Sequence, residues 1–334
     1  MIIKQIADLT QLNQLLQNLP CSELLQSPLW GKVQQAAGRR VFYLGLFDEN
    51  KLTASCLIIK HQLPLCKSWL YSPRLNWPSD QMPQLIDEIA KIAKKESAIF
   101  WKIEFMEHGT WNMEQNCRIQ NSIRRIGGLN SKPLQPPETF IINLTRTPDQ
   151  LLKNMKPKTR YNIRLARKKA VQVRWSKNAA DINIFYDLLT ATARRQKIKI
   201  HPKIHYQNIL KILGDKNTAA LAIAEFDKKP VAANLVTFFG DTAAYLHGGT
   251  DDSYRSLMAP YLLQWEAILE AKRRGCKYYD LGGCAVTTGK IDPWAGITRF
   301  KAGFGGELKQ FGPAYDIVFN RAWHLGLLIV RKLL

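Results

Sequence analysis

Residues 219–239 read AALAIAEFDKKPVAANLVTFF, and the fold expected for this chain follows from that stretch. Two apolar runs of strand length flank a polar turn at 227–230, which is the pattern of a β-hairpin. Residues 41–63, VFYLGLFDENKLTASCLIIKHQL, repeat the pattern around a second polar turn at 48–51. The sequence therefore predicts the same hairpin twice, roughly 175–180 residues apart.

The segments that follow the two hairpins are alike as well. Each hairpin precedes a third strand, an amphipathic helix with Lys or Arg in its last turn, and a fourth strand. These elements are expected at 68–75, 84–96 and 98–105 in the first half, and at 242–250, 261–275 and 276–283 in the second. A short helix and a strand close each half. This order is that of a GNAT-like domain, a fold that holds an acyl donor where two adjacent strands separate.

We therefore expect an α+β protein of two tandem GNAT-like (acyl-CoA N-acyltransferase-like) domains. The length of 334 residues agrees, because a single hydrophobic core seldom spans so long a chain. Domain 1 is expected at 1–145 and domain 2 at 146–317, with a C-terminal helix at 318–334 that returns to domain 1. Residues 1–19 lack the apolar run of a signal peptide and are expected to form one amphipathic helix that ends at Pro20.

The chain is strongly basic. Its 48 Lys and Arg against 27 Asp and Glu give a formal charge of +21 at pH 7, which favours a polyanionic partner over a merely soluble basic surface. Nucleic acid, a phosphorylated substrate and an anionic membrane face all fit this charge. The six cysteines contain no Cys-x-x-Cys pair, so we expect reduced, mostly buried thiols of a cytosolic protein. No apolar run reaches the ~18 residues of a membrane span.

The most basic segment lies between the two halves. Residues 146–174 contain ten Lys or Arg and a single acid, Asp149. Four of these basic residues recur at i, i+4, i+7 and i+8, so one face of a helix carries them all. They are Arg160, Arg164, Arg167 and Lys168. A solvated helix usually interleaves acids as i,i+4 partners, so the lack of acids favours phosphate binding, with a solvated face as the alternative.

Residues 297–306, ITRFKAGFGG, place Lys301 among aromatic residues and glycines. In a dry pocket its ammonium would stabilise the oxyanion of acyl transfer, and the glycines would let a bulky substrate approach the backbone. The alternative is that Lys301 extends past Phe300 to solvent. The two helices placed to bind the pyrophosphate of coenzyme A lack a glycine-rich loop and begin with a proline instead. Conventional coenzyme A binding is therefore disfavoured.

Histidines raise the question of a metal. His201 and His205 are four residues apart, but Pro202 disfavours the helix that a metal-binding i,i+4 pair requires. No nearby acid or cysteine completes a ligand set, so no metal is predicted. We expect instead a polar loop wall against an anionic or sugar-bearing substrate, with a solvated loop as the alternative. Its residues are His201, Lys203, His205 and Tyr206.

Five blocks of sequence carry a family resemblance. They are SPLWGKV (27–33), LLKNMKPKTRYNIRLARKKAVQV (151–173), YLHGGT (245–250), APYLLQWEAILEAKRRGCKYYDLGG (259–283) and DPWAGITRFKAGFGG (292–306). Their order resembles that of the FemX/FemAB peptidyltransferases, over nearly the whole chain. Some members of that family carry a coiled-coil arm in the second domain. Between Asp181 and Ala219 there is no room for one, so this chain resembles the armless members.

The resemblance implies an aminoacyltransferase with two GNAT-like domains. Such an enzyme moves an amino acid of the Ala, Ser or Gly class from aminoacyl-tRNA to the stem-peptide amine of a peptidoglycan precursor, for interpeptide bridge formation. The acceptor would be UDP-MurNAc-pentapeptide or lipid II. The implied partners are therefore a tRNA and a muropeptide, with no cofactor beyond aminoacyl-tRNA as co-substrate.

The resemblance also implies roles for particular residues. Phe300 and Lys301 match the family's Phe-Lys pair, whose lysine is implicated in catalysis, and Glu104 falls near an acid proposed to act beside the acceptor amine. Eight positions fall on or near precursor-binding elements: Lys32, Gln34, His201, Lys203, His205, Tyr206, Tyr245 and His247. The tRNA would bind what we call the basic stripe: Lys158, Arg160, Arg164, Arg167 and Lys168. Gln34 and His247 stand where the family has a lysine and a tyrosine, so the identity of the acceptor stays open.

Two other functions fit the same residues. One is a GNAT-type N-acyltransferase that acts on another amine, such as that of a sugar or a small peptide. The other is a non-catalytic tRNA-binding module, for which Lys301 would be dispensable. In each case we expect a monomer in the cytoplasm. Its basic, apolar C-terminal segment, NRAWHLGLLIVRKLL (320–334), would either lie on the anionic inner membrane face or pack back on domain 1.

Overall fold

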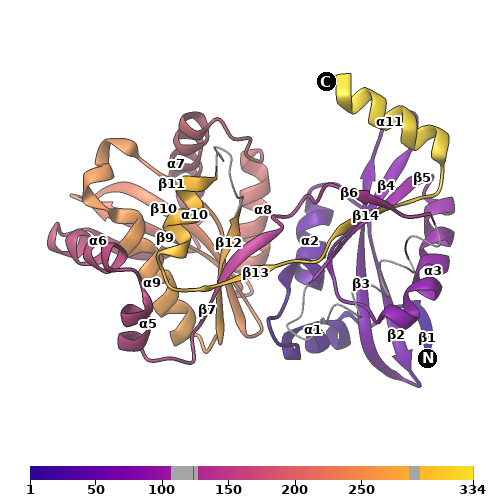
Figure 1. Cartoon of the computed structure of the whole chain (residues 1–334), viewed down its shortest axis with the longest axis horizontal. Helices are drawn as coiled ribbons and strands as arrows, with labels where there is room; N and C mark the ends of the chain where they lie inside the picture. Colours follow the sequence, from indigo (N-terminus) through magenta and orange to yellow (C-terminus); the bar gives the residue numbers. More distant parts are fainter. Residues whose placement is uncertain (107–122, 124–126, 286–293, 334) are drawn as a thin grey trace. The chain divides into compact units, whose positions relative to one another are not determined.

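The computed structural model describes residues 1–106, 123, 127–285 and 294–333, and the chain forms two compact units (Figure 1). Unit 1 contains residues 1–16, 23–137 and 310–334. Unit 2 contains residues 17–22 and 138–309. Over the described residues, each unit is organised around a seven-stranded sheet.

The sheet of unit 1 has the order β1-β2-β3-β4-β5-β14-β6, with β4 and β5 parallel and the other neighbours antiparallel. Its strands are β1 (Ile2–Gln5), β2 (Val41–Asp48), β3 (Lys51–Gln62), β4 (Ser68–Leu75), β5 (Ala98–Phe105), β6 (Leu129–Ser131) and β14 (Ala314–Val318). The accompanying helices are α1 (Leu9–Asn18), η1 (Leu24–Gln26), α2 (Pro28–Ala36), η2 (Ser79–Gln81), α3 (Met82–Lys95) and α11 (Arg321–Leu333). The buried face of α3, with Leu85, Ile86 and Ile89, packs in the same core as Trp101 and Ile103 of β5.

The sheet of unit 2 has the order β13-β7-β12-β11-β10-β9-β8, and here β11 and β12 form the parallel pair. Its strands are β7 (Glu138–Asn143), β8 (Gln172–Ser176), β9 (Ala219–Phe226), β10 (Lys229–Phe239), β11 (Thr242–Thr250), β12 (Tyr278–Cys284) and β13 (Glu307–Gln310). Its helices are α5 (Pro148–Asn154), α6 (Pro157–Lys168), α7 (Asp181–Gln196), α8 (Lys203–Gly214), η3 (Asp252–Leu257), α9 (Ala259–Arg273) and α10 (Ala295–Ala302). The core beneath α9 and α6 is closed by small side chains of β9, namely Ala220, Ala222 and Ala224.

The two units repeat one arrangement, as the duplicated sequence pattern predicts. The hairpins expected at 41–63 and 219–239 are β2–β3 and β9–β10. Each is followed by a third strand, a long helix (α3 or α9) and a strand that lies parallel to the third. Two tandem GNAT-like units of α+β type are therefore confirmed. Helices α7 and α8 fill residues 181–214, the segment in which an arm was considered.

The domain boundaries differ from the expected ones. Strand β7 was assigned to domain 1 but pairs with β12 in unit 2, and β14 was assigned to domain 2 but pairs with β5 and β6 in unit 1. The chain therefore passes between the units at Pro137/Glu138 and Lys309/Gln310, and not at 145/146 and 317/318. Residues 17–22, expected in domain 1, also belong to unit 2. Each of these strands completes a sheet distant in sequence, and pairing at such distance leaves no local pattern. The C-terminal helix, α11, belongs to unit 1.

The N-terminal segment also differs from the single helix expected over 1–19. Residues Ile2–Gln5 form β1, which pairs antiparallel with β2 at the edge of the sheet, and the helix α1 begins only at Leu9. The β-branched pair Ile2 and Ile3 suits an extended edge strand better than a first helical turn. Within the described part of the chain, no helix is both long and apolar enough to cross a bilayer. The five described cysteines carry free thiols. Cys56, Cys276 and Cys284 are buried, as expected for most of them, whereas Cys21 is half-buried and Cys66 is exposed.

Candidate active site

A gap opens between two strands of unit 2. The parallel strands β11 and β12 pair only where residues 242–244 face residues 278–280. Beyond that point β11 continues to Thr250 and β12 to Cys284 without pairing to each other. Gly282 lies at the start of the gap with φ +71°, and a Cβ there would lie 2.6 Å from the carbonyl oxygen of Tyr245. A GNAT-like fold is expected to hold its acyl donor where two strands separate in this way.

The ammonium of Lys301 occupies this gap. Its side chain leaves α10, is only 6% exposed, and donates a hydrogen bond of 2.5 Å from Nζ to the carbonyl oxygen of Gly283 on β12. On the other side, Nζ lies 5.4 Å from the centroid of the Tyr245 ring on β11, within cation–π range. Lys301 therefore does not extend past Phe300 to solvent.

Burial changes the acidity of Lys301. Desolvation lowers its pKa to about 8, although the nearby Asp280 carboxylate and Cys284 act in the opposite direction. Because the charged form still predominates at pH 7, the gap holds a desolvated cation that can also release a proton near neutral pH. Perturbed acidity of this kind, in a group that lines an opening of the fold, is typical of a functional site.

Asp280 supports this geometry, and sequence reasoning missed it. Its carboxylate accepts the backbone N–H of Gly282 at 2.7 Å and the hydroxyl of Thr139 on β7. These bonds fix the left-handed turn at Gly282 and place a negative charge close to Lys301. The available signal was local, because an Asp two residues before a Gly commonly caps the backbone in this manner, as in the stretch YYDLGG (278–283).

Three histidines gather near Tyr245 and Lys301. The rings of His201 and His205 lie 4.2 Å apart between centroids, and that of His247, on β11, lies 6.2 Å from His201. Burial, then the charges of His205, His201 and Lys301, lower the pKa of His247 to about 3. His247 is therefore a neutral imidazole at physiological pH and contributes hydrogen bonding without charge.

The expected loop wall is partly wrong. Helix α8 begins at Lys203, directly after Pro202, so His205 and Tyr206 stand on its first turn and not on a loop. Pro202 ends the extended segment before it, since a proline restricts the residue that precedes it but is compatible with a helix start. Tyr206 is fully buried, and its hydroxyl accepts the N–H of His201 at 3.3 Å, so Tyr206 supports the loop from within.

Lys203, the first residue of α8, is the remaining member of the expected wall. Its ammonium lies 5.9 Å from the ring centroid of Tyr186, on α7. The structure brings together six of the residues singled out from the sequence, and Lys203 adjoins them through Tyr186, whose ring centroid lies 6.0 Å from that of Tyr206. The six are His201, His205, Tyr206, Tyr245, His247 and Lys301.

Phe300 and the glycines after Lys301 contact other parts of unit 2. The Phe300 ring contacts Tyr261 and Phe304, at centroid distances of 5.0 and 5.2 Å, whereas the ring over the ammonium is that of Tyr245. A Cβ at Gly305, where φ is +80°, would lie 2.5 Å from the carbonyl oxygen of Asn154. At Gly303 a Cβ would collide with Thr159. These two glycines thus let α10 and the residues after it pack closely on the chain itself.

The basic stripe lies on α6, as expected, but two of its members are engaged. Arg167 forms an ion pair of 2.8 Å with Glu266 of α9, and Arg160 donates to the carbonyl oxygen of Met155 at the end of α5. The three remaining members, Lys158, Arg164 and Lys168, are exposed and have no ion pair among the described residues. The stripe adjoins the Lys301 helix, because the N–H of Lys156 donates to the carbonyl oxygen of Gly303 at 2.9 Å.

The remaining candidates lie in unit 1. Glu104, on β5, is buried and accepts the N–H groups of Leu134 and of Gln135, the latter at 3.2 Å. Gln34 is buried in α2, and its side-chain oxygen accepts from Arg39 at 2.5 Å, while Lys32 is exposed on the same helix. Glu104 thus braces the loop after β6, and its proposed place beside an acceptor amine stays a prediction.

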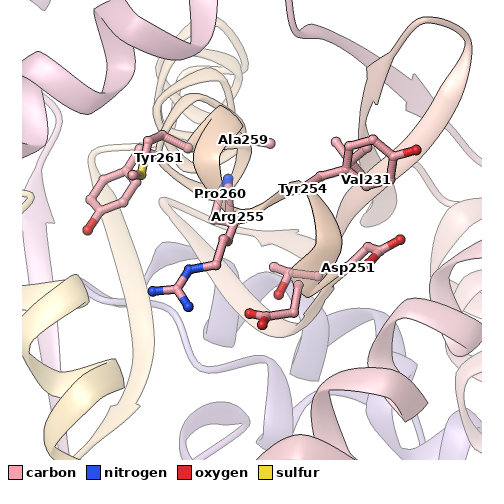
Figure 2. A pocket seen from close by; sticks show the side chains of 10 residues that line it. Val231, Asp251, Tyr254, Arg255, Ala259, Pro260 and Tyr261 are labelled. Atoms are coloured by element: carbon pink, nitrogen blue, oxygen red, sulfur yellow. The ribbon is translucent and has the colours of Figure 1, made fainter.

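A second hollow of unit 2, of about 110 Å³, lies at the start of α9 (Figure 2). This is the helix end at which a coenzyme A pyrophosphate would be expected. Two carboxylates, of Asp251 and Asp252, line the hollow against one guanidinium, that of Arg255, and Pro260 removes an amide donor from the first turn of the helix. These features do not suit a pyrophosphate. No three His, Cys, Asp or Glu side chains converge as a metal site within the described ranges.

Two like units, one with a buried ammonium between separated parallel strands, define a tandem acyltransferase-like protein. The model of the FemAB family matches residues 9–230 and 222–321 of this chain. The chain therefore belongs to the FemAB family.

Individual relatives agree with this assignment. The lipid II:glycine glycyltransferase of Staphylococcus haemolyticus is 21% identical over 380 residues, which cover 90% of this chain and 89% of that protein. The UDP-N-acetylmuramoylpentapeptide-lysine N(6)-alanyltransferase of Weissella viridescens is 24% identical over 277 residues, covering 79% of this chain and 80% of its own.

Solved structures confirm the fold. The crystal structure of FemX superposes with a TM-score of 0.85 at 18% identity, covering 97% of this chain and 99% of FemX. A tandem GNAT protein from the clavulanic acid biosynthesis pathway superposes with a TM-score of 0.58 at 9% identity, covering 94% of this chain and 97% of that protein.

Proposed function

We propose that this protein is an aminoacyltransferase that moves an amino acid from aminoacyl-tRNA to the stem-peptide amine of a peptidoglycan precursor, for interpeptide bridge formation. The observation that carries the proposal is the buried ammonium of Lys301 in the gap between β11 and β12. The named relatives act, by their names, on lipid II with glycine or on the lysine of UDP-N-acetylmuramoylpentapeptide. Both acceptors present an amine, and neither reaction requires a nucleophile from the protein.

The reaction proposed to occur in the gap is ester aminolysis. The amine nitrogen of the acceptor forms a bond to the ester carbonyl carbon, the carbonyl oxygen becomes an oxyanion, and the bond to the ribose oxygen then breaks. The attacking nitrogen loses a proton and the leaving ribose oxygen gains one. Lys301 carries a positive charge where negative charge develops, in a site with little water, where such stabilisation is strongest. Its lowered pKa also makes it a suitable proton donor to the ribose oxygen.

The donor is proposed to be a tRNA and not coenzyme A. The proline in the first turn of α9 and the two carboxylates beside it argue against a pyrophosphate, and the exposed cations Lys158, Arg164 and Lys168 suit a phosphate backbone. The hydrogen bond from Lys156 to Gly303 keeps that surface beside the Lys301 helix. The aminoacylated end of a tRNA bound on the basic stripe can thus reach the gap without leaving unit 2. No cofactor is needed besides the aminoacyl-tRNA.

The acceptor side is proposed more broadly. The neutral His247, together with His201 and His205, lies beside the gap and can bind the amide and carboxylate groups of a stem peptide. In unit 1, Lys32, Gln34 and Glu104 are proposed to contact the precursor. We propose that the protein acts as a monomer on the cytoplasmic side, where charged tRNA is available.

The test is a transfer assay with purified protein. Alanyl-, seryl- and glycyl-tRNA, each labelled in the amino acid, are incubated with UDP-MurNAc-pentapeptide or with lipid II, and acetyl-CoA replaces the tRNA in a parallel arm. We expect label in at least one acceptor with one aminoacyl-tRNA, and none from acetyl-CoA. Absence of transfer from all three tRNAs to both acceptors would overturn the proposal. Transfer from acetyl-CoA would instead support an ordinary N-acyltransferase.

A further inference from the structure

Helix α11 is apolar on the side that faces solvent. His324 points inward, where its ring lies 5.1 Å from that of Phe100 on β5 and its Nε2 lies 3.5 Å from Asp316. Leu325 and Ile329 are at i and i+4, on the other side of the helix, and are 60% and 52% exposed. An amphipathic surface helix normally presents polar residues there. The outer face of α11 therefore has the composition of a buried one.

A second segment, next to the first turn of α11, also exposes an apolar side chain. The turn between β3 and β4 carries Leu65, which is 74% exposed. Two residues later, Lys67 places its ammonium 5.3 Å from the ring centroid of Trp323, in the first turn of α11. The turn and the helix are therefore neighbours in unit 1. We call their exposed apolar side chains the apolar edge: Leu65, Trp323, Leu325, Leu328 and Ile329.

The described charged side chains that flank the apolar edge are basic. Lys67 and Arg321 flank it, and the sequence from 319 to 334 contains Arg331 and Lys332 but no Asp or Glu. Asp316, just before this segment, is buried and paired with Lys102 at 2.7 Å. A second copy of the chain would bring two basic surfaces together, which disfavours self-association. Apolar side chains ringed by Lys and Arg instead match a surface of anionic headgroups over hydrocarbon.

We propose that the apolar edge docks this protein on an anionic lipid bilayer. The helix of 13 residues is about 20 Å long, too short to span a bilayer, so α11 lies in the interface plane. Leu325 and Ile329 enter the boundary between headgroups and acyl chains, while Lys67 and Arg321 contact lipid phosphates. Resting on the proposed function, docking also favours the lipid-linked acceptor over the soluble one, because docked protein and lipid-linked precursor share one surface.

The test is vesicle co-sedimentation with the full chain. One vesicle set contains about three parts phosphatidylcholine to one part phosphatidylglycerol, and the other contains phosphatidylcholine alone. Each Lys or Arg near an anionic surface strengthens binding about fivefold, so two give a preference of roughly 25-fold for the anionic set. We expect Ile329→Glu to weaken that binding roughly tenfold or more, since it places a charge within the apolar contact.

Ile2→Glu is the matched control. It makes the same exchange at an isoleucine that is 66% exposed, on β1, at the far edge of the same sheet from β14. It should bind anionic vesicles as the unaltered protein does, and circular dichroism should show that both variants are folded. Equal binding of Ile329→Glu and the unaltered protein would overturn the proposal, and so would equal binding to the two vesicle sets. A dimer in sedimentation velocity that Ile329→Glu disperses, without vesicle binding, would assign the edge to self-association and overturn it too.

This experiment contains neither tRNA nor acceptor, so its failure is separable from failure of the proposed function. In a transfer assay, Ile329→Glu should keep its turnover on UDP-MurNAc-pentapeptide and lose it on lipid II held in anionic vesicles. Equal turnover of the variant and the unaltered protein on both acceptors would show that docking does not serve the reaction.

Discussion

Lys301→Met should slow aminoacyl transfer and stabilise the protein at the same time. Methionine nearly matches lysine in length and fits the apolar part of the gap, but it carries no charge and cannot donate to the Gly283 carbonyl. Removing one preorganised donor to a developing oxyanion lowers kcat about 10²–10³-fold in well-studied enzymes. We therefore expect a loss in kcat of that order, with KM for the tRNA little changed.

The stability gain follows from the desolvation of Lys301. Its pKa falls from 10.5 to about 8, and each pKa unit corresponds to about 1.4 kcal/mol, so the charged form costs about 3 kcal/mol of folding free energy at pH 7. Loss of the hydrogen bond to Gly283 offsets about 1 kcal/mol of that. The net gain of about 2 kcal/mol corresponds to a rise in Tm of roughly 4–8 °C for a domain of this size.

The pH dependence of this gain has a definite sign. Above pH 8 the folded protein holds Lys301 neutral, whereas the unfolded chain keeps the proton up to about pH 10.5. The destabilisation by Lys301 is therefore complete below pH 8 and is relieved as the pH rises toward 10.5. The difference in Tm between Lys301→Met and the unaltered protein should shrink over that interval.

Two measurements check this reasoning: single-turnover transfer of labelled amino acid, and thermal melts at several pH values. Lys229→Met, at an exposed position on β10, is the control and should leave both unchanged. A Lys301→Met variant with normal kcat would remove the ammonium from the chemistry. A variant with lower Tm would refute the desolvation argument, since it would mean that the buried charge stabilises the fold.

Three further predictions concern the pH profile, the stripe and the turn. With an acceptor amine of pKa ~10.4, kcat/KM should rise tenfold per pH unit as the amine loses its proton, and should level off above about pH 8, where Lys301 loses its own. In Lys301→Met the rise should continue without that break. Measuring kcat/KM from pH 6 to 9.5 for both proteins tests this. Reversing Arg164 and Lys168 to Glu should weaken tRNA binding and lower the slope of log K against log salt by roughly 0.7–0.9 per lost phosphate contact. Arg167→Glu should change that slope less, because Arg167 is already paired with Glu266. Equal slopes for the double variant and the unaltered protein in filter binding would show that the tRNA binds elsewhere. Gly282→Ala should lower Tm and slow transfer, because φ there is +71° and the added Cβ meets the β11 backbone; a normal Tm would show that the strands can shift apart.

Local patterns account for the parts of the fold that the sequence predicts. Both hairpins follow from turn residues between apolar runs, and both long helices follow from apolar spacing, so their elements agree with the structure within a few residues. Strands β7 and β14 could not be placed in this way. Each is short, and its partner lies more than 100 residues away along the chain, so the choice of sheet depends on packing that no local window contains.

In the site, too, local sequence patterns identify single residues, whereas their contacts depend on long-range packing. The setting of Lys301 among aromatic and glycine residues singled it out, but the ring beside it is Tyr245, 56 residues earlier, and not Phe300. The partner of Arg167 is Glu266, 99 residues further along the chain, and the i,i+4 spacing of a helix cannot indicate an acid at that distance. The spacing in the sequence pairs His201 with His205, and only the fold brings the ring of His247 close to that of His201.

The gap between β11 and β12 explains why a lysine suits this chemistry. In water an ammonium of pKa 10.5 would be a weak acid and well screened, so it would neither protonate a leaving oxygen readily nor stabilise an oxyanion strongly. Burial lowers the pKa to about 8 and removes the screening, although Asp280 and Cys284 act in the opposite direction, so the charged form still predominates at pH 7. The desolvation of Lys301 therefore both destabilises the fold and makes the ammonium effective in the reaction. A variant that admits water to the gap should for this reason regain stability at neutral pH and lose transfer, even with Lys301 in place.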